Sequence, residues 1–578
     1  MCGIFGITEE NRDLIKNFIH TCSHRGPDAR DIFSTKNLTL GHNLLAITSK
    51  PLDGKQPWIS QRGNVIIYNG ELFNYNDLIT RFKNKYIPKT KCDTEIISWL
   101  FDNYSYEEVI SNFIDSMHSI AFYNKIKNEL ILSRDHVGIK PLFFSEYKNG
   151  IMFSSEIKAL INSVDTSKTI DRHALACTSL LGVNVLRQTI FKGVYKVLPG
   201  ETIIYDLYKK KIKRSFRTLI KPESNNKFLI DEFYQKTSNT IKNSTLGLRK
   251  FGVFLSGGID SSLIAYELNK HIKPINSFTN IMEPNEVING EDHNSDAKVA
   301  KKFSDELKFI HKEIKITPQI IVDNWDDSIK SIEEPRYNWN LPMYYYTNKI
   351  LSNNNIVVTM AGDIGDEIFG GYAHYFRMHK MLNKPKTWSD FIRIWMRKFA
   401  APLSLNVKFD YNDLHEILIK ALPEELWNPD DIVNSAMALD CITTVSEDFF
   451  SRNDRFGMQF SMEGRFPLAS KEYMKYCMSI NSKYKFGKDP SDTKMPVKNS
   501  FKNKIPDYIF SKNKTGWSVP ITVWMQKSDI LKKKYLDNVN TKDGISEILS
   551  KDNYSGNIKR ILITWMMRTW AQQYNMSI

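Results

Sequence analysis

The first third of the chain alternates short apolar runs with turn-forming residues. Residues 64–68 and 119–123, for example, are rich in β-branched and aromatic side chains. Such runs are typical of strands that pack into sheets. We therefore predict an α+β domain of stacked antiparallel sheets over residues 1–205.

A different pattern begins near residue 231, where longer helical segments alternate with buried strand candidates. These candidates are residues 252–255, 275–279 and 356–360. Short apolar runs between helices indicate a parallel sheet covered on both faces. We predict an α/β domain with many helices over residues 231–578 and a polar, basic linker at 206–230. For residues 376–450 the pattern predicts helices and nothing more specific.

Composition supports a protein of two or three domains. The chain has 578 residues, of which 42% are hydrophobic and 25% charged, as in ordinary globular proteins. Its formal net charge of +14 comes from dispersed lysines without a recognition motif, so we do not expect nucleic-acid binding. A solvated lysine-rich surface is favoured. Attraction of anionic substrates is the alternative.

The distribution of apolar and cysteine residues favours a cytoplasmic protein. The chain has no stretch of 18 apolar residues, and charged residues interrupt its first 16 positions. Its six cysteines lack the C-x-x-C spacing of zinc sites. We expect a reducing compartment, no membrane association and no disulfide framework.

Residues 254–262 end an apolar run, turn through two glycines and open a helical segment. Free N–H groups at a helix start bind anions, and serine hydroxyls add donors. The sequence departs from the Walker pattern, which needs a lysine after its last glycine. Its Ser-Gly-Gly-x-Asp-Ser run instead resembles the pyrophosphate loop of enzymes that cleave ATP between the α and β phosphates. The predicted cradle consists of Leu255, Ser256, Gly257, Gly258, Asp260, Ser261 and Ser262.

A cysteine directly follows the initiator methionine. Removal of Met1 makes Cys2 the N-terminus. Its thiol then lies beside an α-amino group of pKa roughly 7.7–8.0, which serves as a general base at neutral pH. The alternative is a small buried residue that opens a strand.

Six short motifs follow one another in the first 160 residues. They are residues 2–6 (CGIFG), 24–28 (HRGPD), 69–74 (NGELFN), 93–95 (DTE), 134–142 (RDHVGIKPL) and 155–160 (SEIKAL). In this order they resemble the segments of class II glutamine amidotransferases. Together with the phosphate loop, they make nearly the whole chain similar to the glutamine-hydrolysing asparagine synthetase family.

The resemblance implies an N-terminal nucleophile hydrolase fold with Cys2 as nucleophile. The Asn69 side-chain amide and the Gly70 N–H are the expected oxyanion donors. Glu71 and Asp93 are the expected acceptors for the α-amino group of glutamine. The alternative interpretations are a turn at Asn69-Gly70 and a helix N-cap at Asp93.

One position departs from the family in this half. The family segment after the equivalent of His42 reads R-L-x-I, and its arginine binds the glutamine α-carboxylate; here Leu44 occupies that place. Loss of such a contact costs about 1.5–3 kcal/mol. Either another basic residue substitutes, with Arg25, Arg30 and Lys50 as local candidates, or glutamine is used poorly and ammonia is the donor.

Residues 361–372 resemble the family run SGEGSDExFGGY. The resemblance implies that Gly362 contacts ATP and that Asp366, with Asp260, holds Mg²⁺ on the pyrophosphate. Asp363 matches an acidic position that takes a proton from ammonium. Relatives that close β-lactam rings have tyrosine there, so the aspartate favours ammonia as nucleophile. Three residues depart from the family: Ala361, Ile364 and Gly365.

Two further segments complete the resemblance. Residues 452–467 are similar to the run RxDRxxMxxxxExRxP and supply Glu463 as a catalytic residue, although Ser470 replaces the aspartate that ends the family segment. Residues 512–520 resemble the RxKxGFxxP segment, whose lysine, here Lys514, stabilises charge on the α-phosphate. The acceptor-side segment 333–342 is one residue shorter than in many relatives.

The resemblance implies a ligase that uses ATP and Mg²⁺. Glutamine hydrolysis through a Cys2 thioester supplies ammonia, which passes internally to the second domain. There an adenylated carboxylate becomes an amide, with loss of AMP and pyrophosphate. Aspartate is the family acceptor, as in asparagine biosynthesis. The alternatives are another carboxylate, such as a uronic acid, and a non-catalytic nucleotide-binding paralogue. A homodimer remains open.

Overall fold

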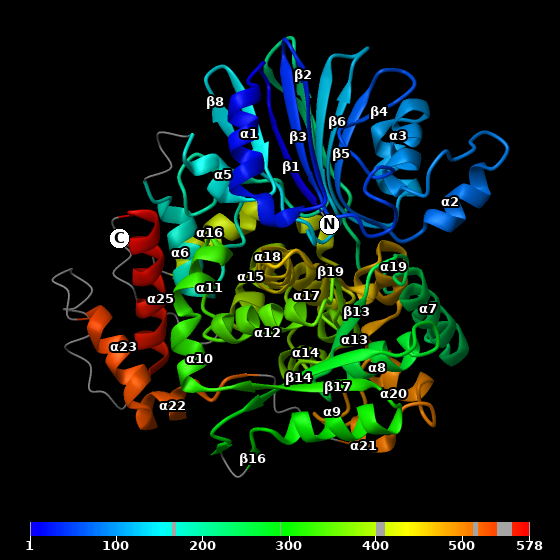
Figure 1. Ribbon diagram of the computed structural model, residues 1–578. Helices are drawn as coiled ribbons and strands as arrows, with labels where there is room; N and C mark the ends of the chain where they lie inside the picture. Colours follow the sequence, from blue (N-terminus) through cyan, green and yellow to red (C-terminus); the bar gives the residue numbers. More distant parts are fainter. Residues whose placement is uncertain are drawn as a thin grey trace.

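The computed structural model describes residues 2–163, 169–288, 291–399, 411–511, 518–539 and 558–576. Figure 1 shows two halves: a pair of upright sheets above, and a helix-rich body below. The start of the chain lies where the two halves meet. The first strand therefore begins at the boundary between the domains.

Two six-stranded antiparallel sheets build the first half, in the orders β10-β8-β9-β1-β3-β2 and β12-β11-β7-β6-β5-β4. The first contains β1 (Cys2–Ile7), β2 (Ala29–Thr35), β3 (Leu38–Leu44), β8 (Phe143–Tyr147), β9 (Gly150–Ser154) and β10 (Val194–Lys196). The second contains β4 (Trp58–Ile59), β5 (Val65–Leu72), β6 (Ser116–Asn124), β7 (Glu129–Arg134), β11 (Glu201–Asp206) and β12 (Lys211–Arg217).

Side chains alternate between the two faces of these sheets, as the strand period requires. On β5, Val65 and Ile67 pack between the sheets, whereas Ile66 and Tyr68 pack against the outer helices. The helices of this half are α1 (Arg12–Thr21), α2 (Tyr75–Phe82), α3 (Asp93–Asn103), α4 (Tyr106–Glu108), α5 (Ile157–Ile161) and α6 (Arg172–Leu181). The predicted stacked antiparallel sheets are confirmed.

The second half contains a five-stranded sheet in the order β17-β14-β13-β18-β19, with every neighbouring pair parallel. Its strands are β13 (Phe251–Phe254), β14 (Asn276–Met282), β17 (Ile310–Ile316), β18 (Val358–Met360) and β19 (Glu463–Arg465). The small hairpin of β15 (Val287–Ile288) and β16 (Glu291–Asp292) lies apart from it. The predicted parallel sheet is confirmed, and β17 and β19 add strands that the sequence pattern did not reveal.

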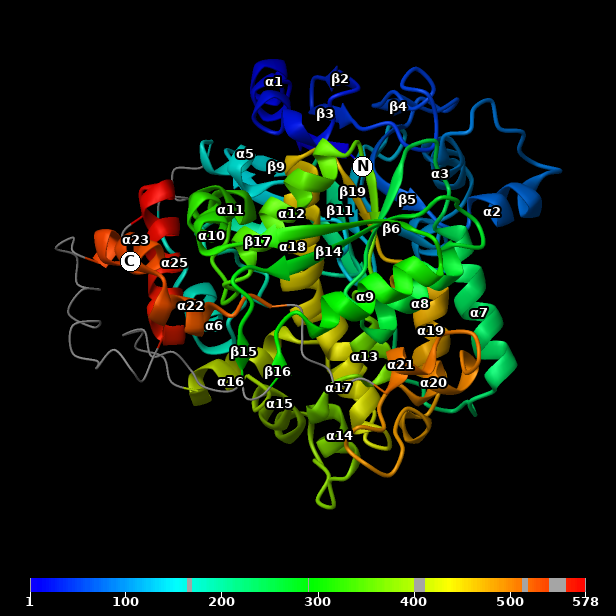
Figure 2. The same ribbon diagram turned by 60° about the horizontal axis from the view of Figure 1, so that its bottom comes forward.

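Helices cover this sheet and extend well beyond it. In Figure 2, α8 and α9 lie beside the parallel strands. From α7 to α14 the helices are α7 (Ile230–Asn243), α8 (Ile259–Leu268), α9 (Ser295–Glu306), α10 (Pro318–Asp323), α11 (Trp325–Ile332), α12 (Leu341–Asn353), α13 (Gly365–Phe369) and α14 (Ala373–His379). The others are α15 (Trp388–Met396), α16 (Tyr411–Ala421), α17 (Ile432–Asp440), α18 (Ser451–Gln459), α19 (Lys471–Ser479), α20 (Met495–Ser500), α21 (Asp507–Phe510), α22 (Ile521–Lys527), α23 (Asp529–Val539) and α25 (Ile558–Tyr574).

The linker predicted at 206–230 contains strand β12, which pairs with β11 in the second sheet. We therefore place the end of the first domain after Arg217. Among the described helices, none is both long and apolar enough to span a bilayer.

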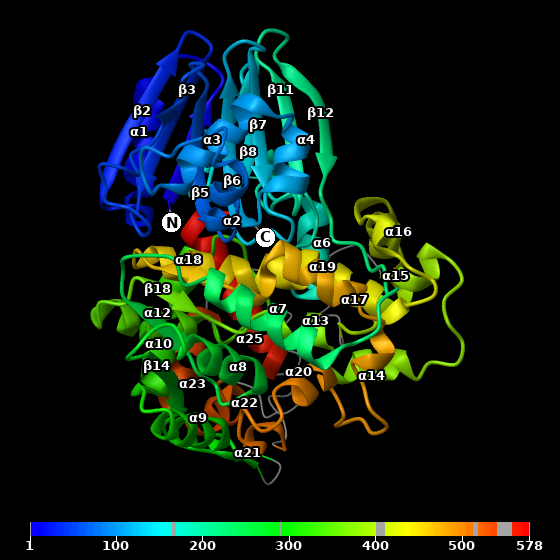
Figure 3. The same ribbon diagram turned by 90° about the vertical axis from the view of Figure 1, so that its right-hand side faces the viewer.

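The two halves meet along α18 and α19, which lie under the ends of the sheets (Figure 3). Buried polar contacts cross this boundary. The Ser470 hydroxyl donates to Asp115 at 2.6 Å, and Lys196 pairs with Glu447 at 2.8 Å. Such contacts are directional, so they fix the first half against the second.

Candidate functional site

Cys2 lies at the start of β1, opposite Leu44 of β3. Its backbone N–H donates to Oδ1 of Asn69 at 2.9 Å, and the Asn69 amide donates to the Ser119 hydroxyl at 3.3 Å. A side-chain NH₂ has a second hydrogen, which remains for an oxyanion. Burial raises the pKa of the Cys2 thiol. The thiol therefore needs a nearby base to become a nucleophile.

Glu71, Asp93 and a residue of the second half meet beside Cys2. Arg465 donates to Glu71 at 2.8 Å and to Glu463 at 2.5 Å. Asp93, the first residue of α3, follows the N-cap Cys92 and accepts the Leu72 N–H at 3.2 Å. Burial raises the pKa of Asp93 to about 6, so this carboxylate is ionised at neutral pH. Because Glu71 already pairs with Arg465, Asp93 is the less committed acceptor for an ammonium group.

The cavity beside Cys2 is small and has no basic lining. Its volume is about 30 Å³, room for one or two waters. Its walls are Cys2, Leu44, Leu45, Ala46, Ile47, Thr48, Ser49, Gly54, Gln56, Tyr68, Gly70, Glu71, Cys92, Asp93 and Thr94. Glutamine entry therefore requires these walls to open.

The three basic residues considered as substitutes for the missing arginine do not reach this cavity. Arg30 is exposed on β2, and Lys50 is exposed in the following loop. Arg25 is fully buried and pairs with Glu156 at 2.9 Å and Asp454 at 2.8 Å. None of the three lines the cavity, so in the described structure none of them takes over the role of the arginine that Leu44 replaces.

Arg25 has a different position, which the sequence did not indicate. Its Nε donates to the backbone carbonyl of Cys2 at 3.1 Å, while its other nitrogens bind Glu156 and Asp454. Asp454 belongs to α18 of the second half. Arg25 thus joins the Cys2 backbone to the second domain through one buried guanidinium.

The predicted phosphate cradle lies between β13 and α8. Gly257 has φ +76°, and a Cβ there would approach the Asp296 carbonyl oxygen at 2.3 Å, so only glycine fits. No side chain caps α8, which leaves its first N–H groups facing the loop. Within the described residues, the buried Ser262 hydroxyl has no hydrogen-bond partner. These donors suit a phosphate group.

The other cradle residues form its scaffold. The hydroxyls of Ser256 and Ser261 are 2.9 Å apart, and the Gly258 N–H donates to Ser256 at 3.3 Å. Leu255 is buried, and its N–H donates to the carbonyl of Phe278 on β14 at 2.9 Å. The loop is therefore held in shape by its own hydrogen bonds and by the neighbouring strand.

A lysine joins the two carboxylates predicted to hold a metal. Lys494, buried before α20, pairs with Asp260 and lies 2.7 Å from Asp366. These two carboxylates raise the pKa of Lys494 against the opposing effect of burial. Gly362 and Gly365 pack directly on Asp260, where a Cβ would come within 2.7 and 2.5 Å of its atoms. The two loops thus place one positive charge between two carboxylates.

Asp363 and Ile364 form the turn between β18 and α13. Burial, with the nearby Asp260, raises the pKa of Asp363, while Arg452 opposes the shift. Ile364 has φ +73°, where the resembling family has glycine. A β-branched residue is strained in this conformation, and burial of its side chain offsets the strain. The turn thus keeps its glycine-like shape despite the substitution.

The described residues also permit a test of the predicted magnesium site. Among them, no group of three or more His, Cys, Asp or Glu side chains is arranged to hold a metal. Mg²⁺ on a nucleotide needs only one or two carboxylates besides phosphate oxygens and water. Asp260 and Asp366 therefore fit a magnesium ion that arrives with ATP. The predicted Lys514 lies outside the described residues.

Glu463 lies between the two predicted sites. It is fully buried on β19, pairs in register with Val358 of β18, and shares Arg465 with Glu71. Burial opposes ionisation of this group, but nearby positive charges, Arg465 and Lys140 among them, hold its pKa well below its usual range. The sequence pattern did not reveal Lys494 or Arg465 as partners of the predicted site residues.

Comparison with known proteins gives two family matches. Residues 1–216 match the glutamine amidotransferase domain, and residues 232–555 match asparagine synthase. Glutamine-hydrolyzing asparagine synthetases 3 and 1 of Bacillus subtilis are 24% and 23% identical over 543 and 609 residues, covering 89% and 95% of this chain and 87% and 93% of theirs. Asparagine synthetase B of Escherichia coli is 26% identical over 411 residues, 68% of each chain.

Proposed function

The chain belongs to the asparagine synthase family of ligases that form C–N bonds, and from this membership we propose that it is an ATP-dependent, glutamine-hydrolysing amidotransferase. It adenylates a carboxylate and converts the acyl-adenylate to an amide. Aspartate is the first candidate acceptor, because relatives across the chain are asparagine synthetases. The observation that carries the proposal is the cradle at α8 with Asp260, Lys494 and Asp366 at its mouth.

In the first half, the proposed chemistry begins at Cys2. Once Met1 is removed, the α-amino group takes the thiol proton and the thiolate attacks the glutamine amide. The second Asn69 N–H and the Gly70 N–H stabilise the oxyanion. Asp93 accepts the substrate ammonium. Ammonia leaves, and water hydrolyses the thioester.

In the second half, the cradle N–H groups and the Ser262 hydroxyl bind the β and γ phosphates of ATP. Asp260 and Asp366 would hold Mg²⁺ that arrives with ATP, and the ion would supply positive charge to the departing pyrophosphate. Lys494 supplies further positive charge at the same place, and Lys514 is proposed to face the α-phosphate. Asp363 takes a proton from any ammonium that reaches the second site, and its raised pKa favours this role. Ammonia then displaces AMP.

The acceptor is tested by a screen of carboxylates for AMP release. With aspartate as acceptor and glutamine or ammonia as nitrogen donor, the enzyme is expected to release AMP and pyrophosphate from ATP in equal amounts. Release with a uronic acid but not with aspartate would select the alternative acceptor. Segment 333–342 keeps that alternative open, because it is one residue shorter than the run of many relatives. In this segment Asn338 contacts Asp448, and Asn340 accepts from the Ser518 hydroxyl.

We expect Leu44→Arg to lower the KM for glutamine. The new guanidinium would face a cavity that has no basic wall and could bind the α-carboxylate in two places. A contact of about 1.5–3 kcal/mol corresponds to a ten- to hundredfold change. The measurement is the glutaminase rate against glutamine concentration.

Leu44→Met is the matched control, because it alters shape without adding charge, and it should leave the KM within about threefold. A further variant tests for a hidden substitute. Arg249 donates to the carbonyl of Ala46 in the cavity wall at 2.8 Å and to Asp28 at 2.7 Å. If Leu44→Arg gains nothing while Arg249→Gln loses glutamine binding, Arg249 already holds the carboxylate.

Asp363→Asn is expected to spare adenylation and to block amide formation. Its carboxylate acts on ammonium, after pyrophosphate has left. Pyrophosphate exchange into ATP, with acceptor but no nitrogen donor, measures the first step alone. The variant should catalyse pyrophosphate exchange at a rate within about threefold of wild type. Its rate of amide formation should fall by about 10²–10⁴-fold, the usual contribution of a general base. Loss of exchange would place Asp363 in the nucleotide site instead.

A further inference from the structure

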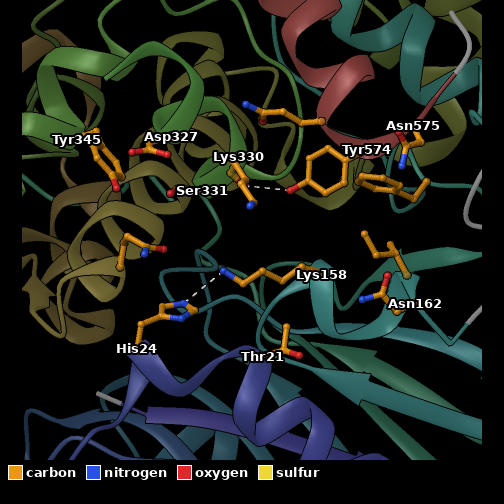
Figure 4. A pocket seen from close by; sticks show the side chains of 14 residues that line it. Thr21, His24, Lys158, Asn162, Asp327, Lys330, Ser331, Tyr345, Tyr574 and Asn575 are labelled. Atoms are coloured by element: carbon orange, nitrogen blue, oxygen red, sulfur yellow. Dashed lines mark hydrogen bonds between the residues drawn. The ribbon is translucent and has the colours of Figure 1, made fainter. Parts of the chain in front are cut away.

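A second cavity, of about 660 Å³, lies between the two halves of the chain (Figure 4). Its walls come from α1 and α5 of the first half and from α11, α12, α18 and α25 of the second. None of its lining residues belongs to the phosphate cradle or to the small cavity beside Cys2. Its volume is within the range of small-molecule sites, about 300–1,000 Å³.

Positive and polar groups converge in this cavity. Figure 4 shows Lys158 and Lys330 extending into the cavity from opposite walls. The Nζ of Lys158 lies 3.4 Å from Nε2 of His24. Tyr574 donates to the Lys330 carbonyl at 3.0 Å and so holds that part of the wall. Within the described residues, the Lys330 ammonium forms no ion pair. The wall also includes the Asp327 carboxylate and the polar side chains of Thr21, Asn162, Ser331, Gln459, Gln573 and Asn575.

One carboxylate connects this cavity to Cys2. Lys158 lies 2.6 Å from Glu156, whose side chain is 1% exposed. Glu156 also binds His24 at 3.1 Å and Arg25 at 2.9 Å, and Arg25 holds the Cys2 carbonyl at 3.1 Å. A change at Lys158 therefore reaches the nucleophile through two side chains, Glu156 and Arg25.

We propose that this cavity binds a small organic anion that bears a phosphate or carboxylate group, and that its binding slows glutamine hydrolysis at Cys2. The anion bridges Lys158 of the first domain and Lys330 of the second, and the amide and hydroxyl side chains bind its polar body. Once Lys158 turns to the anion, Glu156 draws Arg25 more strongly, away from the Cys2 carbonyl. The effect on hydrolysis rests on the proposed function, whereas the binding does not.

Binding is measured by calorimetry on the full chain, with glucose 6-phosphate and citrate as the phosphate and carboxylate probes. At least one probe is expected to bind. Lys330→Gln should weaken that binding about tenfold, a loss of one charge-assisted contact. Lys349→Gln, an exposed lysine of α12 outside the cavity, is the matched control and should leave it unchanged. The proposal is overturned if neither probe binds more tightly than about 1 mM, or if Lys330→Gln changes nothing.

Regulation is measured separately, as the glutamine hydrolysis rate with and without the bound probe. Saturating the cavity with the probe is expected to lower the glutamine hydrolysis rate about fivefold, which is at the lower end of typical allosteric effects. Lys330→Gln should hydrolyse glutamine at the wild-type rate and lose this inhibition. Binding without inhibition would overturn the regulatory part. If no form of the protein hydrolyses glutamine, the proposed glutaminase fails, and the calorimetry still decides on the cavity.

Discussion

Asp260→Asn is expected to reduce acceptor-dependent exchange of pyrophosphate into ATP by about 10²–10³-fold, the effect of removing one group that stabilises developing charge. Asp260 lies in the first turn of α8 and pairs with Lys494, and Gly362 and Gly365 pack against it. Asparagine has the same shape, so the loops should keep their packing. The neutral amide, however, removes a ligand of the proposed magnesium ion and a partner of Lys494.

Two matched variants make this result specific. Asp366→Asn removes the second carboxylate that Lys494 contacts and should lose exchange to a similar extent. Asp363→Asn lies in the same turn and should retain it. Thermal unfolding of all three variants separates lost chemistry from lost structure. Exchange at the wild-type rate in Asp260→Asn would contradict the proposed nucleotide site. Absence of exchange in the wild type, with every carboxylate screened, would favour the non-catalytic alternative.

The sequence predicted those parts of the fold that depend on residues adjacent in the chain. The apolar run at residues 64–68 predicted β5, because a strand buried on both faces places apolar residues on the inter-sheet face and on the helix face. The phosphate loop was predictable for the same reason. Its glycines, serines and helix start are adjacent in sequence, and Gly257 has the positive φ that the turn requires.

Long-range charge pairing was not predictable in this way. Lys494 meets Asp260 across 234 positions, and Arg25 meets Asp454 across 429. Nothing in the sequence near a lysine or arginine indicates such a partner. Arg25 was therefore a candidate for the glutamine carboxylate, whereas the structure commits it to Glu156, Asp454 and the Cys2 carbonyl. Strand β19 was missed because two of its three residues are charged: Arg465 pairs with Glu463 on the same strand and with Glu71 across the domain boundary.

Cys2→Ala is expected to abolish glutamine-dependent amide synthesis and to leave ammonia-dependent synthesis unchanged. The thiol is the only proposed nucleophile for the amide, and loss of a nucleophile costs on the order of 10⁴–10⁶-fold. The second half keeps its own site, since Asp260, Asp366 and Asp363 are not among the residues that line the Cys2 cavity. The measurement is amide formation with each nitrogen donor at saturating ATP and acceptor.

Cys2→Ser is the shape-matched control for this experiment. It keeps the N–H that binds Asn69 and the carbonyl that binds Arg25, and it replaces only the sulfur. It should lose glutamine use as fully as Cys2→Ala, because a hydroxyl is a far weaker nucleophile at neutral pH. A form that retains Met1 should behave like both variants, since its α-amino group is no longer on Cys2. Equal loss with glutamine and ammonia would instead mean that Cys2 supports the boundary between the domains, where Arg25 joins it to Asp454.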